Sequence, residues 1–414
     1  MFWTGKLAAH GLGRSRGRIA LLLVGLAVVA IAMIGGPFSA TAQQAKTLTA
    51  GQPIQTKSRN AILMEAETGA VLFSHNADDM IPPASMSKLM TLAVLFNALK
   101  EGQVKLDTDF PVSEHAWRTG GGPSGTSAMM VPLNSRERID QLLQGVVVQS
   151  GNDAAIAIAE GLSGSEADFA VRMTEYARKI GLKKSTFRNA TGLPHPDQLM
   201  TAREIGQLAR YIITEHADYY PYFGQKEFQY RNHKFPNRNR LLFLPGGVDG
   251  LKTGATKEAG YGVVASAKQD DRRLIVVVSG LASDKERTEE ASRLLDWGFK
   301  SFNSFKLFDP GEVVGKARVY GGSAFYVPLV GNGEVHIWLP RFAASQKLNA
   351  QIIHQSPLKA PIKKGDPIAT LRVTTAGGAS NEAQLYAAED VESGGFSRRG
   401  LDSLLHLAFR WAKF

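Results

Sequence analysis

The chain is organised around one stretch, Pro82-Pro83-Ala84-Ser85-Met86-Ser87-Lys88-Leu89-Met90. Two prolines end an extended segment, and the apolar residues that follow recur at helical spacing as far as Leu99. This pattern predicts that Ser85 lies at the start of a helix. A residue three positions further along lies on the same face of a helix, so the amine of Lys88 can reach the hydroxyl of Ser85.

These two side chains can act as a nucleophile and its base. A serine hydroxyl attacks well only when a base removes its proton, and a lysine held in its uncharged form can do this. The helix start also offers backbone N–H groups to a developing oxyanion. The alternative is an N-cap serine beside a solvated lysine. The spacing alone does not decide, because Ser356 and Lys359 share it in what is expected to be a surface turn.

The composition excludes several classes of function. The chain has 414 residues, 44% of them hydrophobic and 21% charged, which indicates a globular protein of two or more domains. It has no cysteine, so thiol nucleophiles and thiolate metal sites are excluded. The nine histidines are scattered, and His195 with Asp197 is expected to be a loop pair, so we expect neither a metal nor another cofactor. A net charge of +10 without a basic-aromatic motif favours an anionic membrane or polymer over nucleic acid.

Both ends of the chain carry targeting signals. Arginines precede an apolar run from Ile19 to Ile34, and small residues follow, which predicts a signal peptide over 1–42 that is cleaved after Ala42. An uncleaved anchor is the alternative, but the run is shorter than the roughly 20 apolar residues that a span needs. Residues 391–414 are predicted to form a basic amphipathic helix that lies in the plane of a membrane, the alternative being a helix docked on the protein's own core.

The middle of the chain predicts two domains after a linker over 43–59. Over 60–305, a strand hairpin precedes helices, and three strands and a closing helix follow, which predicts an α+β domain of one sheet packed by helices. The helix from Ala154 to Leu162 is one that Asp153 could cap, and residues 219–244 are expected to be loop. Short alternating strands over 306–390 predict a small all-β domain.

Two further triplets accompany the Ser85 stretch, in a fixed order. Ser150-Gly151-Asn152 falls in a turn between helices, and Lys252-Thr253-Gly254 falls at the end of a strand. Each triplet is common, but the ordered set resembles the penicilloyl-serine transferases, which comprise the penicillin-binding proteins and serine β-lactamases. Within that superfamily the chain resembles the low-molecular-mass penicillin-binding proteins that act as serine-type D-alanyl-D-alanine carboxypeptidases. Residues 149–154, 249–261 and 294–299, the β domain and the amphipathic tail extend the resemblance over nearly the whole chain.

The resemblance implies a role for each catalytic residue. Ser85 would attack the D-Ala-D-Ala peptide bond and form an acyl-enzyme, with release of the last D-Ala, and Lys88 would be its base. Burial and the nearby charge of Lys252 would lower the pKa of Lys88. Ser150 would relay a proton to the leaving amine, and Asn152 would orient the substrate amide.

The resemblance also implies a set of substrate-binding residues. These are Thr253, Gly254 and Ala255 on the strand, Arg287 for the substrate carboxylate and Arg238 beside Ser150. The backbone N–H groups of Ser85 and Ala255 would form the oxyanion hole. For both arginines the alternative is a surface salt bridge. Two positions differ from the pattern that the resemblance implies. Ala255 stands where some members of the family have His, and Glu204 stands where Asp is common.

The expected partners are peptidoglycan stem peptides ending in D-Ala-D-Ala, β-lactams as covalent inhibitors, and the outer face of the cytoplasmic membrane, in the periplasm. Three other functions remain open. A β-lactamase is disfavoured because no ExxLN-like element lies between Asn152 and Lys252. A D-Ala endopeptidase or transpeptidase of the same fold is poorly separated by the sequence. A non-enzymatic peptidoglycan scaffold would not need the Ser85, Lys88 and Lys252 set.

Overall fold

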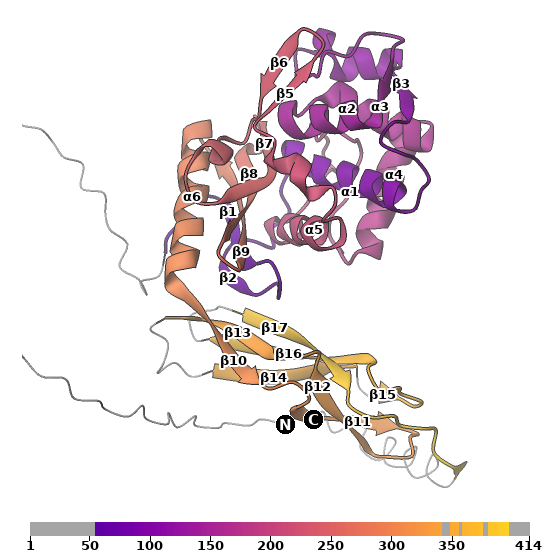
Figure 1. The fold of residues 1–414 in the computed structure, drawn as a ribbon, viewed down its shortest axis with the longest axis vertical. Coiled ribbons are helices and arrows are strands. Elements are labelled where there is room, and N and C mark those ends of the chain that lie inside the picture. The colour runs from indigo at the N-terminus through magenta and orange to yellow at the C-terminus, as the bar shows by residue number, and fades with distance from the viewer. Residues whose placement is uncertain (1–53, 342–347, 356–357, 376–379, 397–414) are drawn as a thin grey trace, which may run out of the picture. The chain divides into compact units, whose positions relative to one another are not determined.

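The computed structural model describes residues 54–341, 348–355, 358–375 and 380–396 (Figure 1). The predicted signal peptide, most of the linker over 43–59 and residues 397–414 of the predicted anchor lie outside these ranges. The described start of the predicted anchor is not helical, because Val391 and Ser393 form β-bridges with Ile362 and Gly322. Among the helices within them, none combines the length and the apolar character needed to cross a membrane.

The first part of the described chain is built on an antiparallel sheet. Its neighbouring strands, in spatial order, are β2 (Val71–His75), β1 (Asn60–Glu65), β9 (Arg272–Leu281), β8 (Gly260–Gln269) and β7 (Val248–Thr256). The predicted hairpin and the three predicted strands are therefore confirmed. The apolar run in the middle of β9 is buried because helices cover both faces of the sheet. The strand β7 ends this order, so one of its edges has no neighbouring strand.

Side chains alternate between the two faces of the sheet, and each face has its own helices. Leu63 and Val276 point into a core closed by α6 (Asp284–Ser301), whereas Ile62 and Val277 point into the larger core on the other side. That larger core is formed with α1 (Lys88–Lys100), α2 (Ile139–Gln144), α3 (Asn152–Ser163), α4 (Glu166–Lys179) and α5 (Ala202–Glu215). The predicted α+β class, one sheet packed by helices, is confirmed (Figure 1).

The smaller elements border the helices, and one of them corrects the sequence analysis. Residues 219–244, expected to be loop, contain η5 (Tyr220–Gly224), a hairpin of β5 (Glu227–Tyr230) and β6 (His233–Pro236), and η6 (Arg240–Phe243). The hairpin forms because Phe228 and Tyr230 alternate inward from a short, charged strand. The other elements are β3 (Asp109–Pro111), β4 (Arg136–Arg138), η2 (Ala116–Gly120), η3 (Gly122–Ser124) and η4 (Gly145–Gln149).

The chain after α6 consists of strands, as predicted. These are β10 (Phe302–Phe308), β11 (Val313–Tyr320), β12 (Tyr326–Gly331), β13 (Val335–Pro340), β14 (Leu348–His354), β15 (Leu358–Lys359), β16 (Pro367–Thr375) and β17 (Ser380–Ala387). The strand pairs β10–β13, β11–β12, β14–β16 and β16–β17 are antiparallel. They enclose a separate core around Val319, Leu329, Leu371 and Leu385. Three of these strands, β10, β15 and β17, were not predicted, and Lys359, expected in a surface turn, lies in β15.

Candidate active site

The turn that carries Ser85 is strained and tightly enclosed. Ser85 lies in the short 3-10 helix η1 (Ala84–Ser87), which continues directly into α1, so the predicted helix start is confirmed. The preceding Ala84 has a φ of +48°, in the left-handed region that costs a non-glycine residue roughly 1–2 kcal/mol. Such strain persists only where the surroundings impose it.

Two glycines from distant segments impose this conformation. A Cβ on Gly254 of β7 would lie 3.1 Å from the backbone nitrogen of Ser85. A Cβ on Gly192 would lie 2.1 Å from the carbonyl oxygen of Ala84, and Gly192 itself has a φ of +82°. Only glycine allows both segments to approach the turn so closely. The edge of β7 therefore lies directly against the nucleophile.

Lys88 is completely buried, and its amine lies between two oxygens. Its Nζ lies 2.9 Å from Oγ of Ser85 and 2.5 Å from the carbonyl oxygen of Thr191. Burial lowers the pKa of Lys88 to about 7, against the opposing charges of Asp153 and Glu166. Near neutral pH, a large fraction of this amine is therefore uncharged and able to accept the proton of Ser85.

Lys252 of β7 is the second buried lysine, and its surroundings are cationic. Its Nζ donates to the carbonyl oxygen of Thr253 at 3.2 Å. Burial lowers the pKa of Lys252 well below its usual value, and the charges of Lys88, Arg287 and Arg238 lower it further. The two lysines therefore lie close enough for the charge of one to oppose the charge of the other.

Ser150 and Asn152 lie where η4 meets α3, and both present polar atoms that the described part of the chain leaves without a hydrogen bond. These are Oγ of Ser150 and Oδ1 of Asn152, both buried. Asn152 is oriented by Thr126, whose Oγ1 accepts from its Nδ2 at 2.8 Å. Ser150 has a φ of +63°, a second strained position in the site. Buried polar atoms of this kind are suited to binding a substrate.

Asp153 is a buried residue whose role the sequence analysis misjudged. It does not cap α3, because Gly151 occupies the N-cap position. Its carboxylate instead accepts from the backbone N–H groups of Met129 at 2.8 Å and Val131 at 3.2 Å. Burial raises the pKa of Asp153, against these hydrogen bonds. The residue thus ties the segment before β4 to the turn that carries Ser150 and Asn152.

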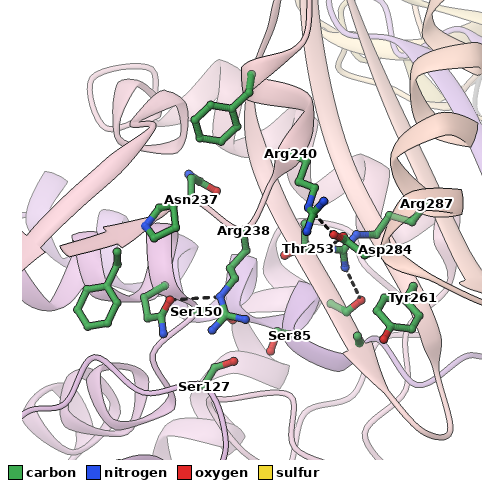
Figure 2. Close-up of a pocket in the computed structure, with 16 residues that line it drawn as sticks. Ser85, Ser127, Ser150, Asn237, Arg238, Arg240, Thr253, Tyr261, Asp284 and Arg287 are labelled. Atoms are coloured by element: carbon green, nitrogen blue, oxygen red, sulfur yellow. Dashed lines mark hydrogen bonds and ion pairs between the residues drawn. The ribbon is translucent and has the colours of Figure 1, made fainter. Parts of the chain in front are cut away.

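A cavity of about 700 Å³ opens over these residues (Figure 2). Among the expected site residues, its lining includes Ser85, Ser150, Arg238, Thr253, Gly254, Ala255 and Arg287. Lys88, Asn152 and Lys252 are buried and do not line the cavity themselves. The structure therefore brings all three predicted motifs to one place. Lining residues that the sequence analysis did not identify include Ser127, Asn237, Arg240, Tyr261 and Asp284.

At the end of the cavity near α6, two arginines surround one carboxylate, so this end carries a net positive charge. Asp284 accepts from Nη2 of Arg287 and pairs with Nε of Arg240 at 2.6 Å (Figure 2). Arg287 is 8% exposed, and its Nη1 lies 3.4 Å from the carbonyl oxygen of Gly254. Burial lowers the pKa of Arg287, although Asp284 opposes this. Arg287 thus has the predicted ion pair, but inside the cavity and not on the open surface.

Arg238 lies at the other side of the cavity. Its Nε donates to Oε1 of Gln149 at 3.2 Å, beside Ser150. Glu204, left out of the expected site, accepts from the backbone of Lys184 and Ser185 and does not line the cavity. Within the described ranges, no group of three or more His, Asp or Glu side chains could hold a metal ion.

Comparison with known proteins gives consistent matches. The profile of the D-alanyl-D-alanine carboxypeptidase family matches residues 46–283, and that of the penicillin-binding protein 5 C-terminal domain matches residues 302–393. The chain is 37% identical to D-alanyl-D-alanine carboxypeptidase DacC of Escherichia coli, over 84% of this chain and 88% of that one.

Solved structures of penicillin-binding proteins are also similar to this chain. Penicillin binding protein 5 from Haemophilus influenzae is similar with a TM-score of 0.69 and 34% identity, over 83% of this chain and 99% of that one. Penicillin binding protein 6B from Escherichia coli is similar with a TM-score of 0.62 and 29% identity, over 81% of this chain and 96% of that one.

Proposed function

The chain belongs to the D-alanyl-D-alanine carboxypeptidase family of penicillin-binding proteins and is a serine-type carboxypeptidase, and on this premise we propose which residues perform the reaction. Ser85 is the nucleophile and Lys88 is its general base. The observation that carries this assignment is the 2.9 Å contact between Nζ of Lys88 and Oγ of Ser85, made by an amine whose pKa burial lowers to about 7.

The reaction runs through an acyl-enzyme. Oγ of Ser85 attacks the carbonyl carbon between the two D-Ala residues as its proton passes to Lys88. The backbone N–H groups of Ser85 and Ala255 hold the oxyanion. The C–N bond then breaks as Ser150 gives its proton to the leaving amine of D-Ala and regains one from protonated Lys88, which returns Lys88 to its neutral form. Water then attacks the ester carbonyl and gives a proton to Lys88, and that proton passes to Oγ of Ser85 as the ester C–O bond breaks.

The substrate binds as an added strand. The free edge of β7 lies against Ser85, so an extended peptide can pair with its backbone near Thr253 and Ala255. The carboxylate of the terminal D-Ala binds at the cationic end of the cavity, where Nη1 of Arg287 lies 3.4 Å from the carbonyl oxygen of Gly254. Asn152 orients the scissile amide, and Arg238 forms the wall beside Ser150.

The biological substrates are stem peptides of peptidoglycan that end in D-Ala-D-Ala, and β-lactams acylate Ser85 as covalent inhibitors. The chain is exported by the signal peptide over 1–42 and acts in the periplasm. Residues 397–414 hold it at the outer face of the cytoplasmic membrane. What supports the location is the sequence pattern at both ends of the chain.

Mass spectrometry after incubation with benzylpenicillin, together with D-Ala release from an N-acylated D-Ala-D-Ala peptide, tests the assignment. A long-lived adduct on Ser85 with D-Ala release is the expected result. Ser85→Ala should abolish both, whereas Ser87→Ala, two residues away in the same turn, should keep both. Rapid penicillin turnover without an adduct would indicate a β-lactamase, and neither adduct nor release would indicate a scaffold.

Truncation tests the anchor separately. A chain that ends at Gly400 should keep its carboxypeptidase activity and leave the membrane fraction. A truncated chain that still sediments with membranes would refute the proposed role of the C-terminal segment.

A further inference from the structure

The amine of Lys88 is held on the side away from Ser85 by a segment without regular secondary structure. Its acceptor there is the carbonyl oxygen of Thr191, in the stretch Asn189–Leu193 between α4 and α5. The neighbouring carbonyl, that of Ala190, accepts from Oγ1 of Thr91 at 2.7 Å. Two consecutive carbonyls thus bind two side chains of α1, three residues apart. The position of Lys88 therefore depends on what fixes this segment.

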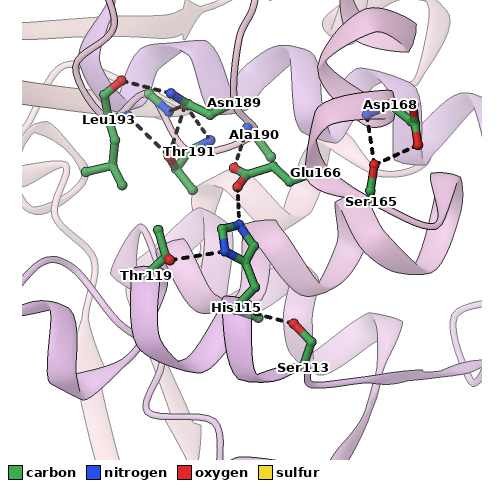
Figure 3. A network of polar contacts seen from close by, with 12 residues as sticks. Ser113, His115, Thr119, Ser165, Glu166, Asp168, Asn189, Ala190, Thr191 and Leu193 are labelled. Carbon is green, nitrogen blue, oxygen red and sulfur yellow. Dashed lines mark hydrogen bonds and ion pairs between the residues drawn. The ribbon is translucent and has the colours of Figure 1, made fainter.

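Hydrogen bonds within the segment fix part of its conformation. Oδ1 of Asn189 accepts from the backbone N–H groups of Gly192 at 2.8 Å and Thr191 at 3.2 Å (Figure 3). Gly192 lies against the carbonyl group of Ala84. These contacts give the segment its shape and hold it against η1, but they do not connect it to α4.

Glu166, the first residue of α4, makes that connection. Its Oε1 accepts from the backbone N–H of Ala190 at 3.0 Å, and its Oε2 lies 2.7 Å from Nε2 of His115 (Figure 3). Nδ1 of His115 in turn lies 3.2 Å from Oγ1 of Thr119. The side chain of Glu166 is 12% exposed, whereas that of His115 is 49% exposed. A partly exposed histidine is thus linked through Glu166 to the segment that holds Lys88.

We propose that Glu166, held by His115, is a positioning residue for the general base. It fixes the Ala190–Thr191 carbonyls against α1 and places a negative charge near the buried amine of Lys88. This inference rests on the proposed role of Lys88. That charge raises the pKa of Lys88 and so opposes the effect of burial. The other ionisable groups that face Lys88 are Asp153 from α3 and Lys252 from β7.

Helix capping does not account for the arrangement. An acidic residue in the first turn of a helix is stabilised by the helix dipole wherever it points. Asp168 lies in the same turn, and its backbone N–H donates to the N-cap residue Ser165 at 3.0 Å. Its carboxylate is exposed and accepts from Oγ of Ser165 (Figure 3). Asp168 is therefore a matched control with the same charge on the same turn.

The test is the pH profile of acylation by benzylpenicillin. Glu166→Gln removes the charge but keeps an oxygen that can accept from Ala190, so the acid limb should move to lower pH. Glu166→Ala also releases the segment, and acylation should fall about tenfold to a hundredfold at every pH. Asp168→Asn should leave both the rate and the acid limb unchanged. Thermal unfolding checks that each variant is folded. If Glu166→Ala does not fold, the pH profile of Glu166→Gln alone tests the proposal.

The possible outcomes separate this inference from the assignment on which it rests. An acid limb that stays in place in Glu166→Gln, or that moves equally in Asp168→Asn, would overturn the role of Glu166. Wild-type acylation in Lys88→Ala would instead overturn the role of Lys88 as the base.

Discussion

Replacing Lys88 by methionine should abolish acylation and yet stabilise the folded protein, in a way that depends on pH. Methionine has a similar volume and no charge, so it removes the cost of holding an ammonium group in a dry site. It also leaves the hydroxyl of Ser85 and the carbonyl of Thr191 without a donor, which costs about 1 kcal/mol each. That second cost does not vary with pH, so the two effects can be separated.

The magnitude follows from the pKa. Folding lowers the pKa of Lys88 from 10.5 to about 7, which corresponds to about 5 kcal/mol. Below pH 7 the lysine is charged in both states, and the folded state carries the full cost. Between about 7 and 10.5 only the unfolded state binds the proton, so the stability of the wild type rises with pH. The stability of Lys88→Met relative to the wild type should therefore fall by about 4 kcal/mol from about pH 6 to about pH 10, and with the two lost hydrogen bonds included it should change from a gain to a loss.

Urea unfolding of both proteins across this range, followed by tryptophan fluorescence, measures the difference. Lys183→Met is the matched control, since Lys183 is exposed and its ammonium group is solvated in both states. A stability difference that is the same at every pH would show that Lys88 is not held in a desolvated site. The argument for an uncharged general base would then fail.

Three further predictions concern the same site. Acylation of the wild type by benzylpenicillin, measured by stopped flow, should be half-maximal near pH 7 on its acid side, because Lys88 has a pKa of about 7 and only its neutral form accepts a proton. Arg287→Ala should lower kcat/KM for a D-Ala-D-Ala peptide about tenfold to a hundredfold, because a charge-assisted hydrogen bond to the substrate carboxylate is lost. Turnover of the matching C-terminal methyl ester, which has no such carboxylate, should be nearly unchanged. Gly192→Ala should abolish acylation and lower the thermal midpoint more than Gly181→Ala, because both glycines have positive φ but only a Cβ at Gly192 would meet the backbone of Ala84.

The sequence predicted those parts of the fold whose signals are local. The continuous apolar run of β9 and the periodic helices α4 and α5 are found where they were expected. The hairpin of β5 and β6 was missed because its strands have four residues each and carry charges on the outside. The strand β10 was missed because it follows α6 without an intervening turn.

In the site, too, the local contacts could be predicted from the sequence and the tertiary contacts could not. The contact between Ser85 and Lys88 could be predicted because three residues separate them on one helical turn. That Ser150 and Thr253 line the same cavity depends on tertiary structure, and only the resemblance of the ordered motifs to a known family indicated it. The sequence gives no indication of the role of Glu166. Its carboxylate accepts from the backbone N–H of Ala190, and a hydrogen bond to the backbone of a distant residue leaves no pattern in the sequence.

The surroundings of the two buried lysines decide which one can be the base. A general base must hold the proton that it takes, and nearby negative charge stabilises the protonated amine. The two lysines face each other, but Lys88 also faces the carboxylates of Asp153 and Glu166, whereas Lys252 also faces the guanidinium groups of Arg287 and Arg238. A proton taken from Ser85 is therefore more stable on Lys88 than on Lys252. Burial makes Lys88 neutral enough to accept the proton, and the two carboxylates keep its pKa high enough to retain it.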